Sequence, residues 1–192
     1  EDIKYLLINH NHFDHAGGLA AIKQETGATL VASALDTPDL EAGKTPRRPE
    51  LDSFTPVKVD RQVKDGAKLR LGSTVLTAHV TPGHTPGCTS WSTVAGGKNI
   101  LFACSLTVAG QKLKGDVAYP NAADDFRATF RKLRAVQADI FLNFHPDFFN
   151  IKDKRAAQLA GKYDAFIDPS ELSRQLDDAE ASIAKELEKQ SR

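Results

Sequence analysis

The sequence predicts an α/β protein, because short apolar runs typical of buried strands alternate with amphipathic segments of helical period. Residues 5–8 are one such apolar run. Residues 123–136 are the clearest helical segment, since Phe126, Phe130 and Leu133 recur at a spacing that places them on one face. Segments of the two kinds follow one another along the chain, which favours layers of sheet and helix.

The first half of the chain contains the following expected elements. A helix over residues 18–25 follows the first strand, and Gly27 is placed to end it. Residues 29–32 form a second buried strand. Residues 34–48 carry two prolines, a glycine and two adjacent arginines, so we predict a loop with about one helical turn.

The second half is richer in strands. The expected elements are a strand-rich region at 68–81 after an Asp-Gly turn, a hairpin of residues 91–94 and 100–104 around Gly96 and Gly97, a strand at 139–144, and a final helix from 168 to about 189. The strand at 139–144 leads directly into His145, a candidate for a functional site.

Composition limits the class of function. Lys and Arg together number 25, as do Asp and Glu, so the formal net charge is zero and offers no electrostatic footprint for nucleic acid or an anionic membrane. No apolar stretch approaches the roughly 20 residues of a membrane span. The 192 residues are enough for a single domain over 1–192 with its own core. The two cysteines are either free thiols or one disulfide, and their number does not separate these states.

Four metal-ligating side chains, His10, His12, Asp14 and His15, stand within six residues. A polar turn without a cation would leave several of these groups unsatisfied if it buried them together. A divalent metal removes that difficulty, because imidazole nitrogen and carboxylate oxygen are ligands that zinc accepts. The order H-x-H-x-D-H also fits two metals, since alternate histidines converge on one ion while the Asp-His pair faces another.

Two later histidines occupy similar places. His84 lies in the rigid turn 81–87, and His145 precedes a proline at a strand end. Taken singly, each is more often an ordinary loop histidine. Beside the first cluster they complete two sets of three ligands. His79 lies inside an expected strand, and we interpret it as a packed imidazole.

Residues 10–15, together with the later Pro-Gly-His-Thr-Pro-Gly of 82–87, resemble the metallo-β-lactamase superfamily. The resemblance covers nearly the whole chain and is closest to the zinc β-lactamases of subclass B3. Ser105 selects that subclass. Other zinc β-lactamases have a ligand cysteine at this position, and hydrolases of the glyoxalase and lactonase type have a metal-bridging aspartate there. Further segments that resemble subclass B3 are residues 83–91, 124–127 and 145–149.

The resemblance implies a four-layer αβ/βα sandwich made of two similar halves. In the family, the first strands and a flexible loop that covers substrate precede the H-x-H-x-D-H segment, whereas this sequence has nine residues before His10. We therefore expect a fold that is incomplete at the N-terminus, hence a partial sequence. A sheet without its leading strands would present an unpaired edge and an apolar face.

The resemblance also implies two zinc ions per chain. The first would be bound by His10, His12 and His84, and the second by Asp14, His15 and His145. Asp14 and His84, one from each set, are the catalytic candidates. The implied reaction is hydrolysis of the β-lactam amide of penicillins, cephalosporins and carbapenems by a zinc-bound hydroxide.

Ser105 and Thr107 follow the expected hairpin and are candidate hydroxyl donors to water or to the substrate carboxylate. They are as readily explained as polar residues at a strand end.

Some subclass B3 enzymes are expected to carry a disulfide at the positions of Cys88 and Cys104. The predicted hairpin would bring these segments close enough for a bridge, although two small buried thiols are the alternative. A disulfide would fit a periplasmic or secreted protein, and no signal peptide is visible in the sequence.

Two other functions stay open. A related hydrolase of lactones or thioesters would use the same zinc ions, and the serine at position 105 in place of a bridging acid counts against it. A non-catalytic zinc-binding fragment is the other alternative. The expected partner is a small β-lactam molecule, with no nucleic acid and no membrane, and the sequence does not indicate an oligomeric state.

Overall fold

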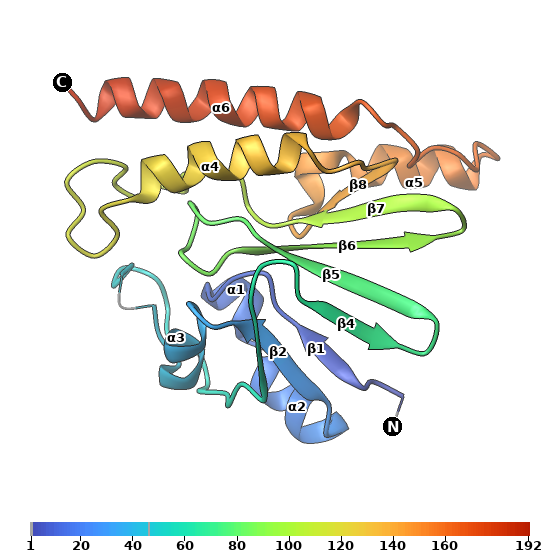
Figure 1. Ribbon diagram of the computed structural model, residues 1–192, viewed down its shortest axis with the longest axis horizontal. Helices are drawn as coiled ribbons and strands as arrows, with labels where there is room; N and C mark the ends of the chain where they lie inside the picture. Colours follow the sequence, from blue (N-terminus) through green and yellow to red (C-terminus); the bar gives the residue numbers. More distant parts are fainter. Residues whose placement is uncertain (1, 46) are drawn as a thin grey trace.

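Two β-sheets lie between two groups of helices in the computed structural model, which describes residues 2–45 and 47–192 (Figure 1). The first sheet is parallel and has the order β1-β2-β3, with strands Tyr5–Leu7, Thr29–Ser33 and Arg61–Val63. The second sheet has the order β4-β5-β6-β7-β8, with strands Lys68–Leu71, Thr74–Val80, Thr89–Ala95, Lys98–Ala103 and Ile140–Asn143.

The strands of the second sheet run antiparallel from β4 to β7, and β8 joins β7 in parallel. Strands β5, β7 and β8 therefore run in the same direction, and their carboxyl ends lie at the same end of the sheet. The helices are α1 (Phe13–Ala16), α2 (Leu19–Thr26) and α3 (Thr37–Ala42) beside the first sheet, and α4 (Ala122–Arg134), α5 (Ile151–Leu159) and α6 (Glu171–Lys189) beside the second, with a 3-10 turn at Pro146–Phe149.

Three apolar clusters fill the spaces between these layers. Strand β2 shows how the layers are built, because Leu30 packs against the helices beside the first sheet while Val31, on the opposite face of the strand, packs against the second sheet. The third cluster lies between the second sheet and the helices α4 and α6, and includes Phe126, Phe141 and Leu176. The order of layers is thus helix, sheet, sheet, helix.

Helix α4 has the amphipathic stripe that the sequence predicts, with Phe126, Phe130 and Leu133 all buried. Its first turn carries two aspartates and its last turn three cations, an arrangement that favours the helix dipole. Gly27 ends α2 with φ at 66°, a left-handed conformation that glycine adopts without strain.

The predicted strands, hairpin and long helices are confirmed, with ends that differ by a few residues. The prediction missed β3 and α5. Strand β3 is short, and of its three residues only Val63 is buried, so its conformation depends on pairing with β2 rather than on an apolar pattern. Helix α5 buries no residue and has little amphipathic character. The predicted loop at 34–48 contains the short helix α3, and Pro46 of that loop lies outside the described residues.

In the described part of the chain, β1 pairs only with β2, and β4 only with β5. A cavity of about 280 Å³ lies beside these two edge strands, and its lining includes Ile3 and Leu71, which are 46% and 53% exposed. Within the described residues, we find no helix with the length and apolar character needed to cross a membrane.

Candidate metal centre

The candidate ligands gather where several strands end. His10 and His12 follow β1, His84 lies in the turn after β5, and His145 follows β8. Asp14 and His15 belong to α1, the short helix that follows directly. Strand ends at one edge of a layered fold deliver side chains to a common point, and all six predicted ligands are brought together there.

The first group consists of His10, His12 and His84, whose ligand atoms all lie within 4.8 Å of one another. All three side chains are buried. His84 Nδ1 donates a hydrogen bond to the carbonyl oxygen of Thr107 at 2.7 Å. This bond fixes the tautomer of His84, so its Nε2 presents a lone pair, 3.1 Å from His12 Nδ1.

The second group consists of Asp14, His15 and His145. His15 Nε2 lies 3.2 Å from His145 Nε2, and Asp14 Oδ2 lies 3.3 Å from the first nitrogen and 3.7 Å from the second. This group is more exposed than the first. The rings of His10 and His15 have centroids 4.2 Å apart, so the two groups are neighbours.

Burial keeps the histidines of the first group uncharged. Desolvation, followed by the charge of nearby His84 and Arg48, lowers the pKa of His12 to about 3. Burial lowers the pKa of His84 to about 4, against the opposing effect of its hydrogen bond to Thr107. The pKa of His10 also falls well below its usual value through burial. Neutral imidazole is the form that binds a metal ion.

The residues present fit a bound metal. His10 Nε2 is buried and has no hydrogen-bond partner among the described residues, and His84 Nε2 and His12 Nδ1 lie 3.1 Å apart beside it. Buried ring nitrogens that converge in this way are unfavourable without a cation between them. Imidazole and carboxylate ligands in sets of three suit zinc, and three protein ligands are typical of catalytic rather than structural sites.

Asp36, directly before α3, holds the turn that carries His84. Its carboxylate accepts hydrogen bonds from the Thr85 hydroxyl at 3.1 Å and from the Gly87 backbone N–H at 3.0 Å. A Cβ at position 87 would lie 2.4 Å from the Asp36 carboxyl carbon, which explains the glycine. Burial raises the pKa of Asp36 to about 7.

Asn11 supports the loop between His10 and His12. Its side-chain amide donates to Asp39 Oδ2 at 2.6 Å, and the same oxygen pairs with Arg47 at 2.9 Å. The loop that carries His10 and His12 is therefore hydrogen-bonded to α3 through Asn11 and Asp39.

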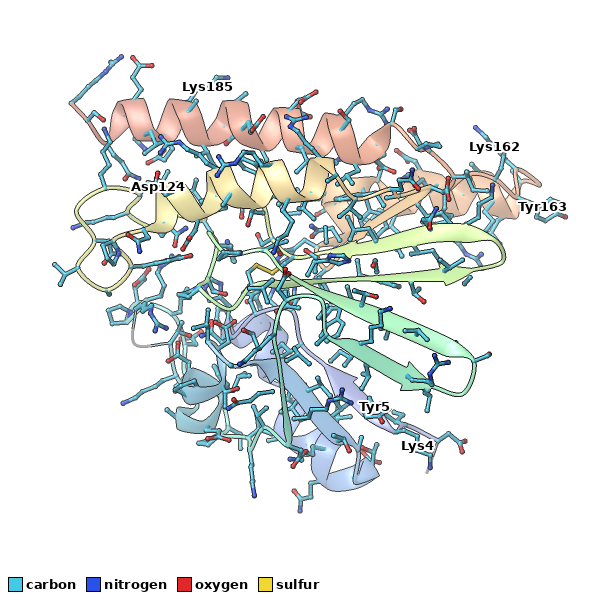
Figure 2. All side chains as sticks on the ribbon, viewed as in Figure 1. Lys4, Tyr5, Asp124, Lys162, Tyr163 and Lys185 are labelled. Atoms are coloured by element: carbon cyan, nitrogen blue, oxygen red, sulfur yellow. A yellow bond between two sulfur atoms is a disulfide. The ribbon has the colours of Figure 1, made fainter. Side chains whose placement is uncertain are left out.

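Cys88 and Cys104 form the predicted disulfide, with Cα atoms 5.9 Å apart. The bridge joins the residue before β6 to the residue after β7, and Figure 2 shows it in the interior, beneath α4. Cys104 Sγ lies 3.8 Å from His10 Nδ1, so the bridge packs against the metal centre. His10 and these two sulfurs also lie within 4.8 Å of one another, but disulfide sulfurs are not thiolates and do not bind zinc as thiolates do.

A cavity of about 370 Å³ opens over the ligands. Its lining also includes Phe13, Arg48, Leu51, Thr107, Ala109, Asp147 and Phe148. Thr107 faces this cavity, whereas Ser105 is buried behind it with its Oγ 3.0 Å from Thr107 Oγ1. A larger cavity, about 630 Å³, lies between α4 and α6 and contains none of the six ligands.

His79 belongs to neither group, and its ring hydrogen-bonds the Ser92 hydroxyl at 2.7 Å. Arg48 and Asp36 could not be singled out from the sequence. Both lie in the predicted loop at 34–48, whose pair of arginines gives no indication that one of them lines the cavity. Nothing in the local sequence marks Asp36, because its partners lie 49 and 51 residues away.

Comparisons with known proteins agree with this geometry. Residues 1–145 match the sequence profile of the metallo-β-lactamase superfamily. The structure of BJP-1, a subclass B3 metallo-β-lactamase of Bradyrhizobium japonicum, matches this chain with a TM-score of 0.93 and 45% sequence identity. The match covers 99% of this chain and 74% of BJP-1. A mutant metallo-β-lactamase of Cronobacter sakazakii is similar over 99% of this chain and 77% of its own, with a TM-score of 0.95 and 38% identity.

The curated relatives include hydroxyacylglutathione hydrolases. A hydroxyacylglutathione hydrolase of a Chelativorans species is 32% identical over 127 residues, which are 60% of this chain and 44% of the relative. A hydroxyacylglutathione hydrolase of a Methylobacterium species is 38% identical over 79 residues, 25% of its length. This chain thus spans less than half the length of these relatives.

Proposed function

The chain belongs to the metallo-β-lactamase superfamily and has its αβ/βα fold, and we propose that it is a zinc-dependent hydrolase of the β-lactam amide bond in penicillins, cephalosporins and carbapenems. The predicted family and fold class are confirmed, and the chain spans about three quarters of the solved B3 structure. The finer activity is our proposal. The observation that carries it is the second ligand group, to which the described residues contribute Asp14, His15 and His145 and no further acid.

That absence matters because of position 105. A lactonase or glyoxalase-type site is expected to place a bridging aspartate there, but this chain has Ser105, which is buried and hydrogen-bonds to Thr107. The described residues lining the cavity include no serine or cysteine that would serve as a nucleophile. Both features support a β-lactamase of the B3 type, in which the metal centre rather than a side chain supplies the reactive group.

The ligand assignment follows the two groups. We propose that His10, His12 and His84 hold one zinc ion and that Asp14, His15 and His145 hold a second. Zinc held by these ligands would supply a Lewis acid that polarises the lactam carbonyl and would lower the pKa of water to about 7. Asp14 and His84 are the catalytic candidates, one in each group.

The chain's own residues prepare the site for this chemistry. Burial keeps His12 and His84 neutral at pH 7, and the Thr107 carbonyl holds the Nδ1 proton of His84, so that Nε2 is free to bind. Thr107 lines the cavity, and we propose that its hydroxyl donates to the substrate carboxylate while Ser105, which hydrogen-bonds to that hydroxyl, positions it. Leu51 and Phe148 supply an apolar wall for the rest of a small substrate.

The second candidate is a thioester hydrolase, favoured by the hydroxyacylglutathione hydrolases among the sequence relatives. We rank it second because these matches span less than half of each relative, whereas the likeness to the B3 structure covers nearly the whole chain. The buried disulfide supports a protein that works in the periplasm or outside the cell, where disulfides persist.

A substrate panel tests the proposal. Zinc-loaded protein is assayed with a penicillin, a cephalosporin, a carbapenem, a lactone and a hydroxyacyl thioester of glutathione. We expect turnover of all three β-lactams, abolished by a chelator and restored by zinc. Cleavage of the thioester or lactone with no action on any β-lactam would transfer the assignment to the second candidate.

A further inference from the structure

Arg48 is a charged side chain in the cavity over the metal ligands. It lies on the loop after α3 and lines the cavity together with Thr107, His12 and His84. Its side chain is 12% exposed, so the charge is largely withdrawn from water. A buried guanidinium is unfavourable unless acceptors surround it.

The hydrogen bonds of Arg48 leave part of the guanidinium without an acceptor. Nε donates to the Glu50 carboxylate, and Nη2 donates to the carbonyl oxygen of Ala109 at 2.8 Å. Nη1 is buried and has no hydrogen-bond partner among the described residues. Two of the three nitrogens thus fix the plane of the group, while the third is enclosed by protein and has two N–H groups without an acceptor among the described residues.

The loop that receives Arg48 is itself constrained. Ala109 has φ at 49°, a left-handed conformation that is uncommon for a residue with a side chain. Ala109 lies two residues after Thr107, whose carbonyl oxygen orients His84 and which also lines the cavity. Arg48 therefore joins the loop after α3 to the loop after β7 across the cavity.

The positive charge of Arg48 lies in the same cavity as His12 and His84. A positive potential of this kind attracts an anionic ligand toward the cavity.

We propose that Arg48 binds the carboxylate of the substrate, as a charged partner to the Thr107 hydroxyl. This rests on the proposed function, since penicillins, cephalosporins and carbapenems all carry a carboxylate on the ring joined to the lactam. A planar guanidinium with fixed orientation suits a carboxylate, and charge-assisted hydrogen bonds are stronger than neutral ones. Held there, the substrate would place its lactam bond over the two ligand groups.

The competing role for Arg48 is a brace between two loops, and the test must separate the two. A carboxylate anchor distinguishes an acid from its neutral ester, whereas a brace does not. We would measure KM and kcat of zinc-loaded Arg48→Ala and Arg48→Lys for a penicillin and for its methyl ester. Lys112→Ala is the matched control, because it removes one positive charge from an exposed position that does not line the cavity.

For Arg48→Ala we expect KM of the acid to rise by about ten- to a hundredfold, because the variant loses one charge-assisted hydrogen bond to the carboxylate. KM of the ester should stay unchanged. Arg48→Lys should recover part of the acid preference because it keeps the charge. Lys112→Ala should behave like the wild type. Equal losses for acid and ester, or no loss, would make Arg48 a brace and overturn the proposal.

A binding measurement decides the question even without β-lactam turnover. Calorimetry compares mercaptoacetate with methyl mercaptoacetate on zinc-loaded wild type and Arg48→Ala, with zinc content checked in both. We expect Arg48→Ala to weaken only the acid, by at least about tenfold. If the wild type hydrolyses no β-lactam but this difference is present, the proposed function fails and the anion site stands. If the acid binds both proteins equally, the anion site fails.

Discussion

Replacing Asp36 with alanine should loosen the turn that presents His84. The substitution removes the acceptor of two buried donors, the Thr85 hydroxyl at 3.1 Å and the Gly87 N–H at 3.0 Å. Each unpaired buried donor costs about 1–3 kcal/mol, so the free energy of unfolding should fall by about 2–6 kcal/mol. Asp36 does not contact His84 itself, so a looser turn should weaken zinc affinity by no more than the about 10–100-fold that follows loss of a direct hydrogen-bond partner of a metal ligand. We expect that loss at the first ligand group only.

Asp36→Asn is the matched control. Its amide oxygen can accept from Gly87 and its amide nitrogen can donate to the Thr85 hydroxyl, so asparagine replaces the protonated Asp36 side chain and the loss of stability should stay below about 1 kcal/mol at about pH 4. Urea unfolding followed by the fluorescence of Trp91, together with chelator competition for zinc, measures both effects. Equal stability of Asp36→Ala and the wild type, or equal losses in the alanine and asparagine variants, would refute the reasoning.

The pH dependence of Asp36 gives an independent check. Burial raises its pKa from 3.8 to about 7 in the fold, so the folded state holds the proton more tightly than the unfolded chain. Its contribution to stability is therefore complete below about pH 4 and is lost as the pH rises to about 7, by up to about 1.4 kcal/mol per pH unit. The histidines whose pKa is lowered make the fold more stable as the pH rises. This effect is the same in the wild type and in Asp36→Asn, so it cancels when the two proteins are compared. The free energy of unfolding of Asp36→Asn should therefore rise relative to that of the wild type between about pH 4 and pH 7. A difference between the two proteins that stays constant with pH would contradict the burial of an ionised Asp36.

Three further results are expected. His84→Ala and Asp14→Ala should each bind one zinc ion in place of two. Each should lose more activity than the about 10–100-fold that follows loss of a residue hydrogen-bonded to a metal ligand. A variant that keeps two ions would remove that residue from its ligand group. Thiol titration of the denatured, unreduced protein should find no free thiol, and a Cys88→Ser and Cys104→Ser double variant should lose about 3 kcal/mol of stability, whereas two titratable thiols would exclude the bridge. Serine-directed β-lactamase inhibitors should leave the rate unchanged, and inhibition through a stable acyl-enzyme would contradict a mechanism without a side-chain nucleophile.

The candidate metal ligands could be predicted because their signal is local. His10, His12, Asp14 and His15 stand within six residues, so the cluster is visible before any folding is considered. His84 and His145 lie far away in sequence, but the prolines and glycines around them mark strand ends, where an α/β fold places its sites. The layers were predictable for a similar reason, since apolar period distinguishes strand from helix.

The support around the ligands could not be predicted in this way. Asp36 binds a turn that lies about 50 residues further on, and its role exists only once α3 packs against the loop after β5. Arg48 looks like an ordinary loop cation until the loop after β7 closes over it through Ala109. Strand β3 is equally dependent on tertiary structure, because it owes its conformation to β2. Sequence patterns report local preference and burial, whereas these contacts depend on the relative position of distant segments.

The central claim is that two neighbouring three-ligand groups form a dinuclear zinc centre. Anomalous X-ray diffraction at the zinc edge, on crystals of the zinc-loaded protein, tests it most directly. We expect two anomalous peaks, one among His10, His12 and His84 and the other among Asp14, His15 and His145. A single peak, or a peak outside these groups, would contradict the assignment.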